Sequence, residues 1–399
     1  MSSPTFGSSQ FNHDSLQSSP NLTGRQIKIT DVTLREGEQA AEVAFAPEEK
    51  LEVALALADA GVHVVQVGYA GQDEAAVRLI RNARPELNIA CLVVGWAADA
   101  EDRISAAYDA GASVCSLLFR STPGHLADLG FTVDEAKTRV RHLAEHGRAL
   151  GFAHVVFGPS FATLAEWQTL SGLFSAAIDG GADVISVADS TGVAAPWAMR
   201  ELVRRMRELD PKVAVRVHTH NDYGLGLQNA LASIEAGADW IEASVNGLGE
   251  RAGNCALEEL VVALRALYGY DTGVRTSALT EISQLVSRLS GAAVPPMKAI
   301  VGENCFANKL EIHVRTAARH PELMEPFDPV LVGGVRMIKL GRGTGPTGVT
   351  LRANALGFEL TDAELATVVQ WVNEQAIATK APINDEMLHK EIEWLRSNA

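Results

Sequence analysis

Two histidines placed two residues apart are the part of this sequence whose type and spacing best suit metal chemistry. They are His218 and His220, at the end of the apolar run VAVRVHTHN over residues 213–221. Side chains two apart on a β-strand point to the same face, and neutral imidazole is a favoured ligand of divalent transition metals. The alternative interpretation is one core histidine and one loop cap, which is the more common outcome for an isolated HxH.

Alternating apolar and amphipathic segments predict the elements that would position these histidines. From Gln26 onward the alternation indicates βα units and a parallel sheet. The expected strands begin near residues 27, 63, 88, 113, 154, 183, 213 and 240, and the expected helices near residues 47, 73, 99, 132, 164, 196, 225 and 255. Eight units predict the α/β class and a (β/α)8 TIM barrel over roughly residues 26–270. An open doubly wound sheet would carry a GxGxxG turn after its first strand, where this chain has ITDVTLREGEQ.

The segments on either side of the barrel predict the domain organisation. Residues 1–24 are rich in Ser and Asn and lack the apolar stretch of a signal peptide, so they are expected to be a disordered tail. The catalytic barrel domain is expected over residues 25–275. A chain of 399 residues exceeds the roughly 250 of a single barrel, so a smaller second part is expected over residues 276–399.

Composition and charge exclude several classes of function. The chain is 47% hydrophobic and 21% charged, as in a soluble globular protein, and its net charge of -15 argues against a nucleic-acid or membrane partner. No apolar run approaches the ~18 residues of a transmembrane helix. The four cysteines form no CxxC pair, so neither a disulfide framework nor a thiolate zinc site is indicated, and a reducing, cytoplasmic compartment is expected.

Polar side chains gather at the predicted ends of several strands, which is where the chemistry of a TIM barrel takes place. The first strand delivers Arg35, Glu36 and Gln39, and the seventh delivers the two histidines. Others follow the fourth, sixth and eighth strands: Arg120, Ser190 and Asn254. Singly, such a residue is more often a loop hydrogen-bonder than a catalyst. Together they predict a divalent-metal site with a guanidinium beside it, able to hold and polarise a 2-oxo acid.

Three motifs give the sequence a specific resemblance to a known family. DVTLREGEQ, the stretch from VHTHND to GLGERAGN, and GENCFANKLEIHV resemble the motifs of the DRE-TIM metallolyase superfamily, in its branch of homocitrate synthase and 2-isopropylmalate synthase. The resemblance implies a TIM barrel followed by small, mainly helical C-terminal subdomains. It also implies an acyltransferase that condenses acetyl-CoA with a 2-oxo acid and releases CoA, a divalent metal (Mn, Mg, Zn or Co) and a homodimer. The end of the chain near Ala399 leads us to expect the shorter, homocitrate-synthase-like architecture without an allosteric domain.

Carried over by position, the resemblance implies roles for individual residues. Glu36, His218 and His220 match the metal ligands, and Asn254 in GERAGN matches an accessory ligand. Arg35 would lie against the keto oxygen of the substrate. The chemistry agrees with that role, because the alkoxide that develops in such an addition needs nearby positive charge.

Departures from the pattern leave the acid and base arrangement open. Relatives carry a glutamate where this chain has Gln66, and a histidine and a tyrosine where it has Asn308 and Met324. His313 is the remaining motif-matched histidine, and we expect it to be the catalytic base, alone or with Glu303. The alternative is a surface histidine on a helical subdomain.

Three residues at the predicted barrel mouth bear on the choice of substrate: Gln39, Arg120 and Ser190. Arg120 ends the fourth strand, where relatives usually have a small or apolar residue, so its guanidinium could bind a second anionic group. The alternative is a salt bridge to a neighbouring loop. The first interpretation predicts an anionic 2-oxo acid: oxaloacetate, 2-oxoglutarate, or a phosphono or phosphino analogue.

Two other functions are compatible with the sequence. A carbon-carbon lyase, of the HMG-CoA lyase or 4-hydroxy-2-oxo-acid aldolase kind, would share the DVTLR motif but has no use for GENCFANKLEIHV. A non-catalytic relative is suggested by Gln66, Asn308 and Met324, whereas the intact set of metal-ligand residues argues against it.

Overall fold

The computed structural model describes residues 6–9, 12 and 26–398, which form two compact units. The barrel unit is Ser9–Val294, and the C-terminal unit combines Met1–Ser8 with Pro295–Ala399. The predicted disordered tail over residues 1–24 lies outside the described residues, apart from 6–9 and 12. Within the described residues, no helix has both the length and the apolar character needed to cross a membrane.

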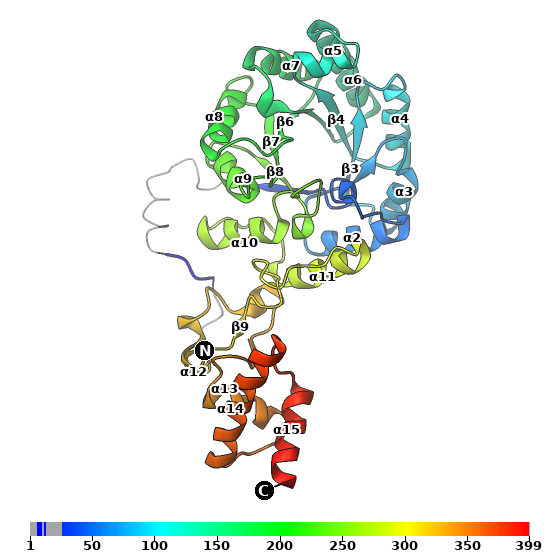
Figure 1. The fold of residues 1–399 in the computed structure, drawn as a ribbon. Coiled ribbons are helices and arrows are strands. Elements are labelled where there is room, and N and C mark those ends of the chain that lie inside the picture. The colour runs from blue at the N-terminus through cyan, green and yellow to red at the C-terminus, as the bar shows by residue number, and fades with distance from the viewer. Residues whose placement is uncertain (1–5, 10–11, 13–25, 399) are drawn as a thin grey trace. The chain divides into compact units, whose positions relative to one another are not determined.

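Eight parallel strands close into a barrel, as the sequence predicts (Figure 1). The strands pair in chain order, and β1 closes the ring because its Thr30 lies opposite both Val64 of β2 and Glu242 of β8. Their bounds are β1 Lys28–Asp31, β2 Val64–Tyr69, β3 Asn88–Val94, β4 Val114–Arg120, β5 His154–Ser160, β6 Val184–Asp189, β7 Ala214–Thr219 and β8 Trp240–Ala243. The predicted (β/α)8 barrel is therefore confirmed.

Helices surround the strands of the barrel unit, as Figure 1 shows. They are α2 Pro47–Asp59, α3 Glu74–Ala83, α4 Ala100–Ala110, α5 Pro123–Asp128, α6 Val133–Leu150, α7 Trp167–Asp179, α8 Pro196–Arg207, α9 Gly226–Glu235, α10 Leu257–Leu267 and α11 Leu279–Ser290. Local sequence sets their ends. Thr132 accepts a hydrogen bond from the Glu135 N–H at the start of α6, while the Glu135 carboxylate bonds back. Gly111 ends α4 at φ 106, in the left-handed region that glycine adopts most easily.

The interior of the barrel is apolar nearer the amino ends of the strands, here called the lower layer, and polar nearer their carboxyl ends. The lower layer is built from small and medium side chains and one indole: Val64, Ala90, Val114, Val156, Val184 and Trp240. Buried polar side chains lie further toward the carboxyl ends of β2, β4, β6, β7 and β8: Gln66, Ser116, Ser186, Arg216 and Glu242. Arg216, Ser186 and Glu242 of this polar part line the same pocket as Glu36, His218 and His220.

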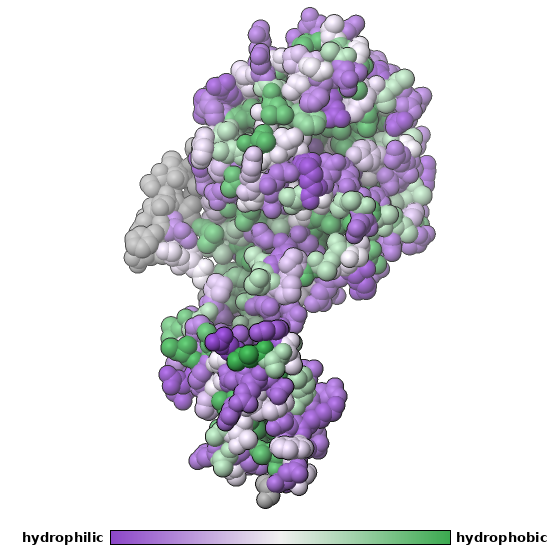
Figure 2. Space-filling view, in the orientation of Figure 1, coloured by the Kyte–Doolittle hydropathy of each residue, from purple (hydrophilic) through white to green (hydrophobic). Residues whose placement is uncertain are grey.

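The C-terminal unit is mainly helical, as the family resemblance implies. It contains β9 Ala307–Asn308, β10 Met337–Ile338, α12 Glu311–Ala317, α13 Pro346–Ala355, α14 Asp362–Thr379 and α15 Asp385–Ser397. Its own core gathers apolar residues of the last three helices, such as Val349, Val368 and Leu388. Figure 2 shows hydrophilic and hydrophobic residues interspersed over the visible face of each unit.

Candidate active site

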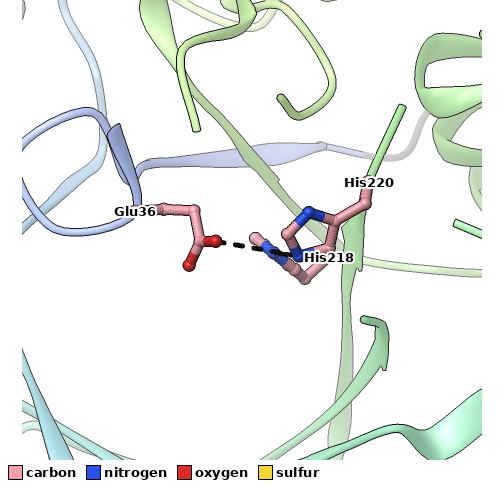
Figure 3. Close-up of side chains that lie close together, drawn as sticks. All are labelled: Glu36, His218 and His220. Carbon is pink, nitrogen blue, oxygen red and sulfur yellow. Dashed lines mark hydrogen bonds and ion pairs between the residues drawn. The ribbon is translucent and has the colours of Figure 1, made fainter. Parts of the chain in front are cut away.

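Glu36, His218 and His220 lie together at the carboxyl end of the barrel strands (Figure 3). The two Nε2 atoms are 3.1 Å apart, and Glu36 Oε1 is 3.7 Å from His220 Nε2. One ligand atom from each residue falls within 4.8 Å of the others, and all three side chains are buried. His218 is on the inner face of β7, and His220, which directly follows the last residue of β7, lies on the same side, as the HxH spacing predicts.

A tight turn after β1 brings Glu36 to this place. The Asp31 carboxylate accepts hydrogen bonds from the N–H and the hydroxyl of Thr33, each at 2.9 Å. The Thr33 hydroxyl in turn accepts the N–H of Val245 at 2.8 Å, which ties the turn to the segment after β8. The Glu36 N–H then donates to Val32 O at 2.7 Å, so the chain reverses over the barrel mouth.

Glu242 and Arg216 fix the orientation of one histidine. His218 Nδ1 lies 3.0 Å from Glu242 Oε2, and Arg216 Nη1 lies 3.0 Å from Glu242 Oε1. Burial opposes ionisation of Glu242, but the Arg216 charge and the His218 contact outweigh it and lower the pKa of Glu242 to about 2. The ionised carboxylate lies against Nδ1 of His218 and so orients the ring with its other nitrogen, Nε2, near Glu36 and His220.

These donors fit a divalent cation. Burial, with the charge of His218 adding to it, lowers the pKa of His220 to about 2, so its imidazole is neutral. One carboxylate oxygen and two neutral ring nitrogens are a common ligand set for such metals. Asn254, which pairs with His220 across an isolated β-bridge, has a buried Oδ1 with no hydrogen-bond partner in the described part of the chain. Its Nδ2 donates to Leu248 O at 3.1 Å.

Replacing Glu242 by Gln should weaken metal binding by about 10- to 100-fold, because an amide lacks the charge that holds both His218 and Arg216. Calorimetric titration with Zn²⁺ and Mn²⁺ measures this directly. Glu250→Gln is the matched control, since Glu250 lines the same pocket but pairs with Arg251. Equal metal affinity in the two variants would contradict the role of Glu242.

Arg35 and Gln39 both contact Oε2, the second carboxylate oxygen of Glu36. Arg35 Nη1 forms an ion pair with Glu36 Oε2, and Arg35 Nε donates to Gln66 Oε1 at 2.5 Å. Gln39 Nε2 lies 3.1 Å from both Glu36 Oε2 and the Tyr69 hydroxyl. Because Oε2 is held in this way, Oε1 remains directed toward His220.

A single cavity of about 410 Å³ collects most of the predicted site residues. Its lining includes seven of them: Arg35, Glu36, Gln39, Arg120, Ser190, His218 and His220. Asn254 is not among the lining residues. His313 lies on α12 of the C-terminal unit, where its side chain is exposed.

Arg120 is held by aromatic rings. Its Cζ lies 5.0 Å from the ring centroids of both Trp96 and Phe161, and its Nη1 lies 3.4 Å from Ser160 Oγ. No carboxylate in the described residues pairs with it, so the predicted alternative of a loop salt bridge is not found there. Ser190 Oγ holds Phe161, one of these two aromatic residues, by accepting its N–H at 2.8 Å.

Sequence reasoning missed several residues of the pocket, among them Tyr69, Trp96, Arg216 and Glu242. The sequence does contain a signal for Arg216 and Glu242. Arg216 interrupts the apolar run VAVRVH and Glu242 interrupts WIEASV, and a charged side chain inside a barrel strand needs a buried partner.

Comparisons with known proteins agree with this architecture. Residues 26–286 match the HMGL-like family model, and residues 300–380 match the model described as homocitrate synthase post-HMGL domain-like. The chain is 38% identical over 344 residues to a 2-isopropylmalate synthase of Methanocaldococcus jannaschii, and 38% identical over 338 residues to a homocitrate synthase of Methanopyrus kandleri. The chain belongs to the homocitrate synthase and 2-isopropylmalate synthase family.

The share of each relative that aligns with this chain differs between the two enzymes. The alignment with the M. jannaschii enzyme covers 84% of this chain but 64% of that enzyme, whereas the M. kandleri alignment covers 84% of both. Among solved structures, a hydroxymethylglutaryl-CoA lyase of Pseudomonas aeruginosa matches with a TM-score of 0.61 at 21% identity, over 69% of this chain and 96% of the lyase. That likeness concerns the fold alone.

Proposed function

We propose that this protein is an acyltransferase that condenses acetyl-CoA with an anionic 2-oxo acid. The methyl carbon of the acetyl group bonds to the keto carbon, which becomes a tertiary alcohol, and water then cleaves the thioester to release CoA as a free thiol. The observation that carries the proposal is the cluster of Glu36, His218 and His220 beside Arg35 in one pocket. The synthases named above, which share more than a third of their aligned residues with this chain, support it.

In this proposal Glu36, His218 and His220 hold a divalent metal (Mn, Mg, Zn or Co), with Asn254 as an accessory ligand. When bound, such a metal polarises a carbonyl and stabilises negative charge on its oxygen. Arg35 donates to the same oxygen. A positioned donor of this kind is worth about 2.7 to 4 kcal/mol in the transition state.

The charges of the pocket support an anionic substrate. Each of the three carboxylates in its lining pairs with an arginine: Glu36 with Arg35, Glu242 with Arg216, and Glu250 with Arg251. Arg120 is the remaining guanidinium of the lining, and it leaves a positive charge that no carboxylate of the lining offsets. Together with the substrate-binding roles proposed for Gln39, Arg120 and Ser190, this favours oxaloacetate, 2-oxoglutarate, or a phosphono or phosphino analogue.

The base that removes a methyl proton from acetyl-CoA is proposed to be His313. A positioned base contributes roughly 10² to 10⁴ in rate, so His313→Ala should suppress exchange of the methyl protons with D₂O by about that factor, as measured by NMR. His320→Ala is the matched control, since His320 is an exposed histidine of the same unit.

Because a homodimer is also proposed, mixing His313→Ala chains with Arg35→Ala chains should restore part of the activity if one protomer serves the barrel of its partner. Exchange at the unmutated rate in His313→Ala would place the base elsewhere, with Glu303 as the next candidate. Glu303 Oε1 lies 2.6 Å from Lys339 Nζ.

The proposed reaction is tested by the release of free thiol from acetyl-CoA with a divalent metal and one 2-oxo acid at a time. Oxaloacetate or 2-oxoglutarate should release thiol faster than pyruvate, because pyruvate has no anionic tail. Thiol release at the same rate without any 2-oxo acid would indicate a thioester hydrolase and contradict the proposal.

A further inference from the structure

Arg216 lies deep in the pocket with one nitrogen left open. Its side chain is 4% exposed and lines the cavity. Nε donates to Ser186 Oγ at 3.2 Å, and Nη1 lies 3.0 Å from Glu242 Oε1 and 3.5 Å from Ser116 Oγ. Nη2 makes no hydrogen bond to any residue that the structure describes. Two N–H donors of a buried, charged group are therefore available to a ligand.

Gly158 leaves the space in front of these donors. A Cβ placed on Gly158 would lie 3.9 Å from Arg216 Nη2 and 3.2 Å from the Ser186 Cβ. Gly158 and Arg216 both line the cavity, so a side chain at position 158 would take up free space beside Nη2. Gly158, Ser186 and Arg216 line a recess of the pocket, and Ser116, which contacts the guanidinium at Nη1, is buried outside the lining.

The recess at Arg216, here called the floor of the pocket, lies deeper in the barrel than Arg120, which marks the rim. Arg216 precedes His218 by two residues on the same face of β7, so its backbone is about 7 Å deeper in the barrel. On β4, Arg120 follows Ser116 by four residues, which is about 13 Å along the strand. Arg120 therefore belongs to the rim, and Arg216 to the floor below the histidines.

We propose that the recess formed by Arg216, Ser186 and Gly158 is the subsite that binds the distal anion of the 2-oxo acid. This rests on the proposed function and specifies its substrate class: a carboxylate or phosphono group one or two carbons beyond the keto carbon. Three contacts already fix the Arg216 guanidinium, so binding an anion does not require this side chain to become more ordered. The hydrogen bonds between the guanidinium and the anion form away from water. Arg120, whose ring contacts place it at the rim, adds positive charge at the entrance.

Gly158→Ala tests the recess while leaving the Arg216–Glu242 ion pair in place. We expect it to raise the dissociation constant of oxaloacetate by about 10- to 100-fold, the effect of losing a charged hydrogen bond. The constant for pyruvate should stay within about threefold, because pyruvate does not reach the floor. Both are measured by calorimetric titration of the Mn²⁺-loaded protein without acetyl-CoA. Gly124→Ala is the matched control, because a Cβ there meets nothing within 4 Å.

Arg216→Lys is the second variant, since lysine keeps a charge for Glu242 but has no second nitrogen. It should produce the same loss for oxaloacetate alone. Equal losses for oxaloacetate and pyruvate, no loss in Gly158→Ala, or an oxaloacetate-specific loss found only in Arg120→Ala would each overturn the assignment.

The titration also separates this inference from the proposed function. If the protein released no thiol with any 2-oxo acid but Gly158→Ala still weakened oxaloacetate binding, the floor subsite would stand and the condensation would be wrong. If the unmodified protein did not bind oxaloacetate, the subsite itself would be wrong.

Discussion

Removal of the metal is expected to abolish turnover, and the double variant His218→Ala with His220→Ala is expected to lose the metal itself. With both imidazoles gone, one carboxylate oxygen remains of the three donors that lie within 4.8 Å of one another. A chelator-treated sample should regain activity when Mn²⁺, Zn²⁺, Co²⁺ or Mg²⁺ is added back. Metal content by mass spectrometry and thiol release measure the two effects separately.

A matched control distinguishes loss of ligands from loss of histidines in general. His142 and His146 both lie on α6, outside the pocket lining, and His142 is 53% exposed. Replacing both by Ala should leave metal content unchanged. Full activity in demonstrably metal-free protein would contradict the role of the cluster.

Arg35→Lys should lower kcat by about 10² to 10³ while the fold is retained, as expected for loss of a positioned donor at the reacting oxygen. The guanidinium uses separate nitrogens for Gln66 and Glu36, and a single ammonium cannot reproduce that fixed geometry. Steady-state kinetics give kcat, and thermal unfolding by circular dichroism checks the fold.

Arg103→Lys provides the comparison for this substitution, because Arg103 on α4 lies outside the pocket lining and pairs with Asp99, the residue before that helix. It should change kcat by less than about threefold, within what surface changes usually cause. A kcat for Arg35→Lys equal to that of Arg103→Lys would place the reacting oxygen elsewhere.

Much of the fold was predictable because its elements carry strong local patterns. The strands are apolar runs of the expected length, and signals such as the Thr132 cap mark helix ends. The apolar run IKITDVTL, residues 27–34, predicts a first strand longer than the one observed. Val32 O accepts the N–H groups of Arg35, Glu36 and Gly37, so β1 stops at Asp31 and the chain turns. The helix α5 was missed because six residues are too few to show a helical period.

The site residues that lie on one segment of the chain could be predicted from the sequence. Those whose contacts depend on two or more segments coming together could not. The spacing of His218 and His220 is enough to place them on one face of β7. Their neighbour Glu242 could not be found in this way, because its contact with His218 depends on the pairing of β7 with β8. The rings that flank Arg120 also come from separate segments, and Phe161 adopts φ 58, which nothing in FGPSFAT announces.

The most direct test of the central claim follows the acetyl carbon. The metal-loaded protein is incubated with acetyl-CoA labelled with ¹³C at the methyl group and with oxaloacetate or 2-oxoglutarate, and the products are observed by NMR. We expect a labelled methylene next to a tertiary alcohol, with one free thiol for each 2-oxo acid consumed. Labelled acetate, with both 2-oxo acids left intact, would contradict it.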